Sequence, residues 1–145
     1  MDGIYAAGDV ANHYHPVFER QVRVEHWQNA LKQGAAAARS MLGKGEPYAE
    51  VHWFWSDQYD ANLQYAGFHT EWDELILRGS LEGRRFVAFY LKEGRVLAAA
   101  AMNQGRDLRR TLPVIASRAQ VDAGRLRDEN VDLRTLAERP RTVSG

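Results

Sequence analysis

The sequence predicts an α+β fold in which helices and an antiparallel sheet occupy separate stretches of the chain. Three observations support this prediction. Apolar and small residues recur at helical spacing between residues 25 and 42. Strand-like segments then follow one another from residue 51 to residue 102 with short links, and short links imply antiparallel pairing. Helical spacing returns after residue 106.

The chain opens with residues 3–9 (GIYAAGD), a pattern that predicts a short strand entering a glycine turn. A lone strand leaves its backbone groups unpaired, so this strand must join a sheet. No partner strand is evident nearby, which indicates that the chain starts inside a larger domain. Residues 11–23 are expected to form an irregular connector.

A long helix is predicted from about Glu25 to Leu42, ended by Gly43 and Gly45. Its apolar and small residues share one face, which we expect to pack against another element. The members of this face are Trp27, Ala30, Leu31, Gly34, Ala38, Met41 and Leu42. The glycine-rich stretch 43–47 is the best candidate domain boundary, dividing residues 1–45 from residues 46–145.

The second part is predicted to be mostly strands. The segments are 51–59, 62–68, 74–80, 85–92 and 95–102. Glu93-Gly94 signals a tight hairpin. Beyond the strands, residues 106–118 predict a helix that Pro113 would kink or interrupt, and Asp122 is a candidate cap for a short helix through Leu126. The tail after Glu138 is expected to be frayed.

Composition excludes several functional classes. Of the 145 residues, 19 are Lys or Arg and 19 are Asp or Glu, so no net charge draws the chain to nucleic acid or to a membrane surface. The sequence contains no cysteine, which excludes disulfides and thiolate chemistry and fits a cytoplasmic location. The longest apolar run, Val96 to Met102, is too short to span a bilayer.

Two segments carry candidate chemistry. At the end of the first strand, Gly8 allows close approach of a ligand, and the Asp9 carboxylate can accept hydrogen bonds from sugar or ribityl hydroxyls; the alternative is an Asp that caps a turn. At the start of the long helix, free N–H groups and the helix dipole favour an anion or a carbonyl. There Trp27 adds a flat ring suited to a flavin; the alternative, which this segment alone favours, is that Trp27 is a core anchor and Glu25 a favourable first-turn acid.

These segments, taken with residues 53–59 (WFWSDQY), resemble the end of the oxygenase-coupled ferredoxin reductases, with the apoptosis-inducing-factor group as more distant kin. That family includes the putidaredoxin, rhodocoxin and biphenyl-dioxygenase reductases. The resemblance implies that residues 1–45 are the last strand and helix of an FAD-binding α/β domain. It implies that residues 46–145 are the C-terminal reductase domain, with an antiparallel sheet plus helices.

The resemblance also implies roles for particular residues. Asp9, flanked by Gly8 and Val10, would bind the FAD ribityl chain, and the backbone at Trp27 would meet the flavin pyrimidine ring. Trp55 would lie beside the isoalloxazine near the docking face of the iron–sulfur partner, as a contact or route for electrons. The flavin neighbours with less defined roles are Glu25, His26 and Gln28. Enzymes of the family pass hydride from NADH to FAD and then single electrons to a [2Fe–2S] ferredoxin.

The sequence lacks any G-x-G-x-x-G fingerprint, which holds dinucleotide pyrophosphates at a helix N-terminus. We therefore expect the chain alone to lack an NAD site, to hold FAD weakly or not at all and to be inactive, leaving open whether it is itself an enzyme. The alternative is a free-standing module for dimerisation or partner binding. A homo-oligomer is expected in either case, formed through exposed apolar surfaces or by exchange of the first strand and helix.

Three other groups of residues could carry chemistry, but the sequence supports each of them less well. A metal cluster of His13, His15, Glu19 and His26 is weakly supported, and no metal site is assigned. A hydrolase arrangement of His52, Ser56 and Asp57 lacks a nucleophile elbow. A basic helix face is expected to be solvated, with docking of an acidic ferredoxin as the alternative. Its members are Arg106, Arg109 and Arg110.

Overall fold

The computed structural model describes residues 3–137, which divide into two units between Phe54 and Trp55. Each unit has its own elements and its own packing. The expected domain boundary at residues 45/46 precedes this division. The reason is that the segment after the long helix bonds back to the first unit: Tyr48 donates to Asn29, and Glu50 accepts from His15.

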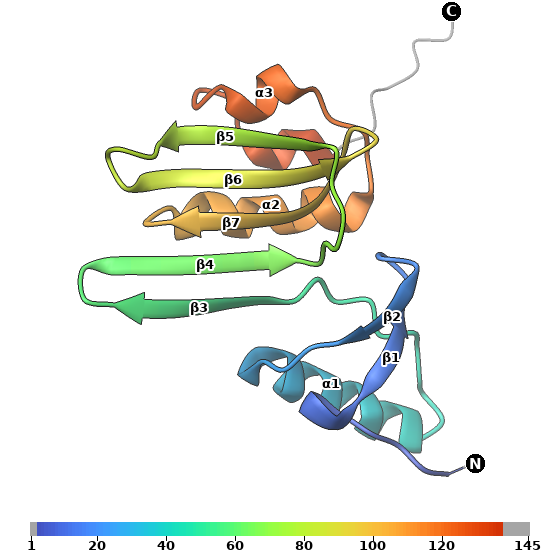
Figure 1. Cartoon of the computed structure of the whole chain (residues 1–145). Helices are drawn as coiled ribbons and strands as arrows, with labels where there is room; N and C mark the ends of the chain where they lie inside the picture. The colour runs from blue at the N-terminus through green and yellow to red at the C-terminus, as the bar shows by residue number, and fades with distance from the viewer. Residues whose placement is uncertain (1–2, 138–145) are drawn as a thin grey trace, which may run out of the picture. The chain divides into compact units, whose positions relative to one another are not determined.

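The first unit contains a short 3₁₀ turn, a hairpin and a long helix (Figure 1). The 3₁₀ turn is η1 (Gly8–Val10), the strands are β1 (Asn12–His15) and β2 (Arg20–Arg23), and the helix is α1 (Trp27–Met41). The strands pair antiparallel with Asn12 opposite Arg23 and His15 opposite Arg20. The turn η1 packs against α1.

Two local predictions for this unit are wrong. Residues 4–7 have no regular structure and the Gly-Asp turn is a 3₁₀ turn, so the expected first strand is not formed. A strand forms only where a neighbour accepts its hydrogen bonds, and the strands described in this unit, β1 and β2, pair with each other. The expected irregular connector 11–23 is that hairpin, closed at Glu19 with a left-handed φ of 52°.

The prediction that the long helix packs through its apolar face is also wrong. Trp27, Leu31 and Met41 on α1 and Leu42 directly after it are exposed, whereas Asn29 and Gln33 are buried. The helix turns its polar stripe inward because η1 and the β2–α1 segment offer backbone groups there that need hydrogen-bond partners. The apolar stripe is thus left uncovered by the described residues of this unit.

The second unit is built on a five-stranded sheet with the order β3-β4-β7-β6-β5. Its strands are β3 (Trp53–Gln58), which starts in the last residues of the first unit, β4 (Ala61–Gly67), β5 (Glu74–Ser80), β6 (Arg85–Lys92) and β7 (Arg95–Met102). The β4/β7, β7/β6 and β6/β5 pairs are antiparallel. The predicted strands and the α+β fold class are confirmed.

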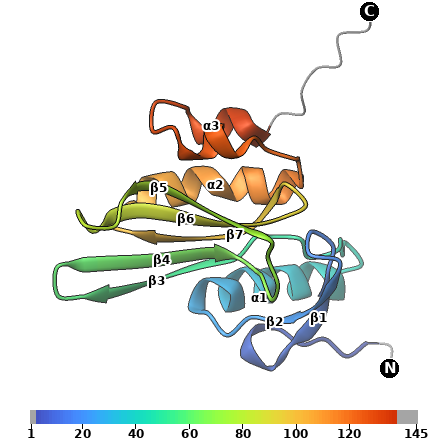
Figure 2. The same ribbon diagram turned by 45° about the horizontal axis from the view of Figure 1, so that its top comes forward.

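Helices cover one face of this sheet (Figure 2). They are α2 (Gly105–Ser117), α3 (Ala123–Arg127) and the 3₁₀ turn η2 (Leu133–Ala137). Fully buried side chains from alternate strand positions meet those of the helices, among them Phe89, Leu108 and Ile115. Each such side chain contributes about 1.5–3 kcal/mol through burial, so this layer is the core of the unit.

Most of the local predictions for the second unit agree with the structure. Glu93 and Gly94 link β6 to β7 with positive φ at both residues, and the Asp122 side chain accepts from the Arg125 amide as a helix cap. The expected interruption at Pro113 is wrong, because α2 runs through it. Pro113 and Arg109, four residues earlier, are both exposed, so water can replace the hydrogen bond that proline removes.

Among residues 3–137, no helix is long and apolar enough to cross a membrane. The tail predicted to fray after Glu138 lies outside the described residues.

Candidate functional site

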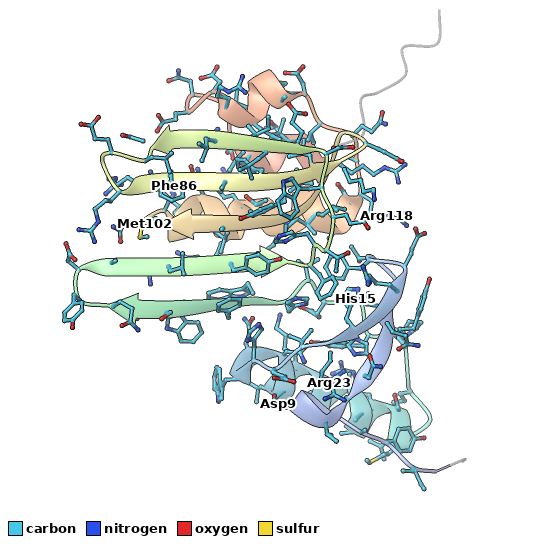
Figure 3. The ribbon with its side chains drawn as sticks, viewed as in Figure 1. Asp9, His15, Arg23, Phe86, Met102 and Arg118 are labelled. Atoms are coloured by element: carbon cyan, nitrogen blue, oxygen red, sulfur yellow. The ribbon has the colours of Figure 1, made fainter. Side chains whose placement is uncertain are left out.

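The turn Gly8–Val10 presents an exposed carboxylate on a tightly packed backbone. Gly8 is buried with a left-handed φ of 79°, and a Cβ added there would lie 3.3 Å from the Ala30 Cβ. The residue must therefore be glycine for both conformation and packing. Asp9 and Val10 are exposed beyond it, and Figure 3 labels Asp9 on this turn. The carboxylate is open to a ligand and is not a helix N-cap.

The start of α1 lies close to this turn. Burial lowers the pKa of His26, against the opposing effects of a hydrogen bond with the Glu25 backbone and of the nearby Asp9 and Glu25 charges. The His26 ring also stacks on Phe54, with 4.2 Å between ring centroids. His26 is the N-cap residue of α1, yet its side chain makes no capping hydrogen bond. The N-terminal amides of the helix thus keep their capacity to meet a polar ligand.

The remaining predicted residues of the first unit surround that helix start. Trp27 is 71% exposed and so is not a core anchor within this chain. Glu25 is exposed and Gln28 is half-buried. The structure therefore gathers the turn around Asp9 and the start of α1 in one unit, with an open aromatic ring beside them.

Trp55 belongs to the second unit, where it lies on β3. Its side chain is 47% exposed. Strand alternation places Trp53 on the same face and Phe54 on the other. Trp55 thus offers a large aromatic surface on the edge strand of the five-stranded sheet.

Sequence reasoning missed the polar residues that lie beneath the Gly8–Val10 turn. The Gly8 amide donates to Gln33 Oε1 at 2.8 Å, and Gln33 Nε2 lies 3.1 Å from His13 Nδ1. Asn29 Nδ2 donates to the Val24 carbonyl at 3.2 Å. The available signal was the spacing of Asn29 and Gln33, four residues apart on one helix face, but the opposite apolar stripe was taken for the packed one.

The alternative constellations gain no support. Among the described residues, no group of three or more His, Cys, Asp or Glu side chains is arranged to hold a metal ion. Asp57 accepts from Asn62 at 2.6 Å and the Ser56 hydroxyl accepts from Gln58 at 3.2 Å, so both have partners from the β3–β4 hairpin. On α2, Arg110 lies 3.8 Å from Asp107, while Arg106 and Arg109 are exposed.

Comparison with known proteins identifies the class to which this architecture belongs. The family model described as Reductase C-terminal matches residues 53–137. This range contains the whole five-stranded sheet and its helical layer. The chain belongs to the reductase C-terminal family.

Individual relatives extend the similarity into the first unit. The chain is 44% identical over 134 residues to the anthranilate 1,2-dioxygenase system ferredoxin–NAD(+) reductase component of Burkholderia cepacia, covering 92% of this chain and 33% of that protein. It is 36% identical to the putidaredoxin reductase of Pseudomonas putida, covering 92% of this chain and 32% of that protein. The chain therefore spans about a third of the length of the curated relatives it matches.

A solved structure is also similar to most of this chain. The crystal structure of the covalent putidaredoxin reductase–putidaredoxin complex matches with a TM-score of 0.82 and 35% identity, covering 90% of this chain and 31% of the matched chain. The likeness includes residues of both units, since 90% coverage cannot be reached by either alone.

Proposed function

We propose that this chain forms the carboxy-terminal third of a flavoprotein that carries electrons from NADH through FAD to a [2Fe–2S] ferredoxin. Residues 1–45 would close one wall of the FAD site, and residues 46–145 would form the C-terminal domain. The names of the relatives support this assignment, since they are ferredoxin reductase components and a putidaredoxin reductase. Bound FAD would supply the redox chemistry, taking up hydride and releasing single electrons.

The observation that carries the proposal is the pairing of the Gly8–Val10 turn with the uncapped start of α1. The turn offers an exposed Asp9 carboxylate, and that helix start keeps amides without a side-chain cap. A ribityl chain needs hydroxyl acceptors, and a flavin pyrimidine edge needs N–H donors. The residues present fit these two parts of FAD. Gly8 and Val10 would flank the ribityl contact, and Glu25, His26 and Gln28 would neighbour the ring.

Trp55 is proposed to act on the ferredoxin side of the flavin. Its half-exposed ring on an edge strand suits contact with a partner protein, because aromatic side chains supply large contact areas. Its proposed role is to touch the isoalloxazine or the iron–sulfur partner and to help electrons pass. Trp53, half-buried on the same strand face, would support that ring.

A chimera tests the proposal. This chain would replace the matching last third of the Burkholderia cepacia reductase component, and FAD content and NADH-dependent ferredoxin reduction would be measured. We expect yellow protein with activity, and loss of most FAD in Asp9→Ala. The matched control is Asp60→Ala, an exposed carboxylate paired with Arg84 in the second unit, which should keep its FAD. A folded chimera without FAD would overturn the proposal.

The chain by itself is proposed to be inactive, because its sequence has no G-x-G-x-x-G fingerprint for either dinucleotide. An absorbance spectrum of the purified chain checks this directly. Flavin bands in the isolated chain, or NADH-dependent dye reduction by it, would contradict the proposal that the chain carries only one wall of the FAD site.

A second candidate function is a free-standing module used for dimerisation or partner binding. The exposed apolar stripe of α1 favours it, because Leu31, Met41 and Leu42 are uncovered in this chain. The two candidates differ in one observable. The isolated chain is expected to self-associate and to stay colourless in both cases, but the chimera built on a free-standing module would not regain FAD.

A further inference from the structure

A hydrogen-bond chain connects the Gly8–Val10 turn, through the buried Gln33, to the half-buried His13, and the donor and the acceptor of each bond in it are determined. The Gly8 backbone N–H can only donate, so the group it meets at 2.8 Å is the amide oxygen of Gln33. The amide nitrogen of Gln33 therefore points to His13 Nδ1 at 3.1 Å. Because an amide NH₂ only donates, His13 Nδ1 accepts. His13 is neutral, with its proton on Nε2.

The same reasoning fixes the next ring on the strand. His15 Nε2 lies 3.0 Å from the Glu50 backbone carbonyl, which only accepts. The His15 proton therefore sits on Nε2. His15 is fully buried in the first unit, and its ring is 5.8 Å from that of His13. Both rings belong to one face of β1. The acceptor role of Nδ1 makes His13 neutral, and burial, which lowers the pKa of His15, favours the neutral form of that ring as well.

The surroundings of His13 favour its neutral form. The ionisable groups facing it are His15 from β1 and Tyr48 from the segment after α1, whose ring is 5.6 Å away. From α1 it meets the uncharged Gln33, and across the hairpin it pairs with Val22. Burial first, and the neighbouring His15 second, lower the pKa of His13. The Glu50 carboxylate is paired with Lys32.

We propose that Gln33 is a positioning residue for the Gly8–Val10 turn, and that it holds the turn only while His13 is neutral. A proton added to His13 Nδ1 would point at the Gln33 NH₂, donor against donor. If the amide rotated by half a turn to accept that proton, its NH₂ would face the Gly8 N–H instead. Without rotation the Gln33–His13 hydrogen bond is lost, and with rotation Gln33 Oε1 no longer accepts from the Gly8 amide or from Asn29 Nδ2, which lies 3.4 Å away. His13 protonation therefore weakens the contacts through which Gln33 holds the turn. The effect on a flavin rests on the proposed function, in which Asp9 binds the ribityl chain.

Gln33 substitutions separate this coupling from a purely structural role. Gln33→Met keeps the shape of the side chain and removes its hydrogen bonds to the Gly8 amide, to His13 and to Asn29. Gln33→Glu has two acceptor oxygens, so it can accept from the Gly8 amide and from a protonated His13 together. The structural role predicts that both substitutions merely destabilise the unit. The coupling predicts different behaviour in acid. In Gln33→Met the Gly8–Val10 turn no longer responds to protonation of His13. In Gln33→Glu protonation of His13 adds a hydrogen bond to the introduced carboxylate and so stabilises the turn.

Nuclear magnetic resonance of the ¹⁵N-labelled chain tests the coupling without any flavin. We expect the Gly8 amide resonance to titrate with the midpoint of His13, and that midpoint to lie below the ordinary 6.5. Gln33→Met should abolish the Gly8 titration, and Gln33→Glu should raise the His13 midpoint. The matched control is His69→Phe in the second unit, which should change neither. A Gly8 amide that ignores His13, or that still follows it in Gln33→Met, would overturn the proposal.

FAD loss from the chimera tests the consequence. Because a net hydrogen bond changes an equilibrium by up to about tenfold, FAD should dissociate about tenfold faster in Gln33→Met than in the parent at pH 7.5. The parent should lose FAD faster as the pH falls through the His13 midpoint, and Gln33→Glu should not. If Asp9→Ala releases FAD while Gln33→Met does not, the positioning role is wrong and the proposed function stands. If neither variant releases FAD although Gly8 follows His13, the proposed function is wrong.

Discussion

Arg78 on β5 binds Asp107 on α2, its Nε donating to the carboxylate Oδ2 at 3.1 Å. Only 4% of Arg78 is exposed, and its other N–H groups reach four backbone carbonyls of the segment that includes the end of α3. These carbonyls belong to Leu126, Asp128, Glu129 and Val131, at 2.6–3.3 Å. One guanidinium thus links the sheet, α2 and the chain after α3. A planar five-donor group suits this geometry and an ammonium does not.

Replacing Arg78 should therefore destabilise the second unit strongly. We expect Arg78→Met to lower the unfolding free energy by about 3–5 kcal/mol, because it leaves buried carbonyls and the Asp107 carboxylate without their donor. Arg78→Lys should recover only part of this loss. Urea unfolding followed by circular dichroism measures the effect.

Arg84→Met is the control for this substitution. Arg84 forms a two-point ion pair with Asp60, but both side chains are exposed, so solvent screening leaves the pair with little effect on stability. Equal losses for Arg78→Met and Arg84→Met would contradict the linking role of Arg78.

Gly8→Ala should damage the candidate FAD site through two additive effects. A left-handed φ costs a non-glycine residue about 1–2 kcal/mol, and the new Cβ would crowd Ala30 at 3.3 Å. Gly43→Ala is a matched control, since Gly43 has a φ of 72° but open space around its Cβ position. The difference in thermal midpoint between the two variants isolates the packing effect. In the chimera, FAD content should fall in Gly8→Ala and not in Gly43→Ala; similar FAD contents would argue against a close turn–helix contact.

The first unit should lose stability in acid through histidines whose pKa is lowered by burial. Burial lowers the pKa of His15 and His13 below the ordinary 6.5, so the unfolded chain binds more protons than the folded one as the pH falls. Stability is complete above about pH 6.5 and declines from there down to the folded-state pKa values, by up to about 1.4 kcal/mol per pH unit for each histidine. Hydrogen exchange of β1 and β2 amides at pH 7.5 and pH 5.5 measures this slope.

His15→Gln is the informative variant for the acid effect. A glutamine NH₂ can replace the His15 donor to the Glu50 carbonyl, yet it does not titrate. We expect a shallower acid slope in this variant, and an unchanged slope in His69→Gln, which changes a histidine of the second unit. A His15→Gln chain as acid-sensitive as the parent would place the titrating group elsewhere.

Local signals in the sequence were sufficient for most of the second unit and insufficient for the first. Glu93-Gly94 and Asp122 determine their turn and cap through neighbouring atoms alone. Ile4 and Tyr5 are strand-forming residues, but a strand needs a partner, and none is described beside residues 4–7. The buried face of α1 was misassigned because amphipathicity shows which side is apolar and not what packs there. Gln33 is buried by the demand of the Gly8 amide, which lies 25 positions away in the chain.

The uncovered apolar stripe of α1 should make the isolated chain self-associate. Leu31, Met41 and Leu42 are 61–74% exposed, and apolar patches of this kind are buried when a partner surface is available. We expect concentration-dependent homo-oligomers in light scattering, and a shift toward monomer in Leu31→Lys. Leu81→Lys, at a similarly exposed leucine of the β5–β6 link, serves as the control. In the chimera Leu31→Lys should reduce FAD content instead, because the stripe would then face the rest of the flavoprotein. A chain that stays monomeric at high concentration would mean that the stripe does not drive association.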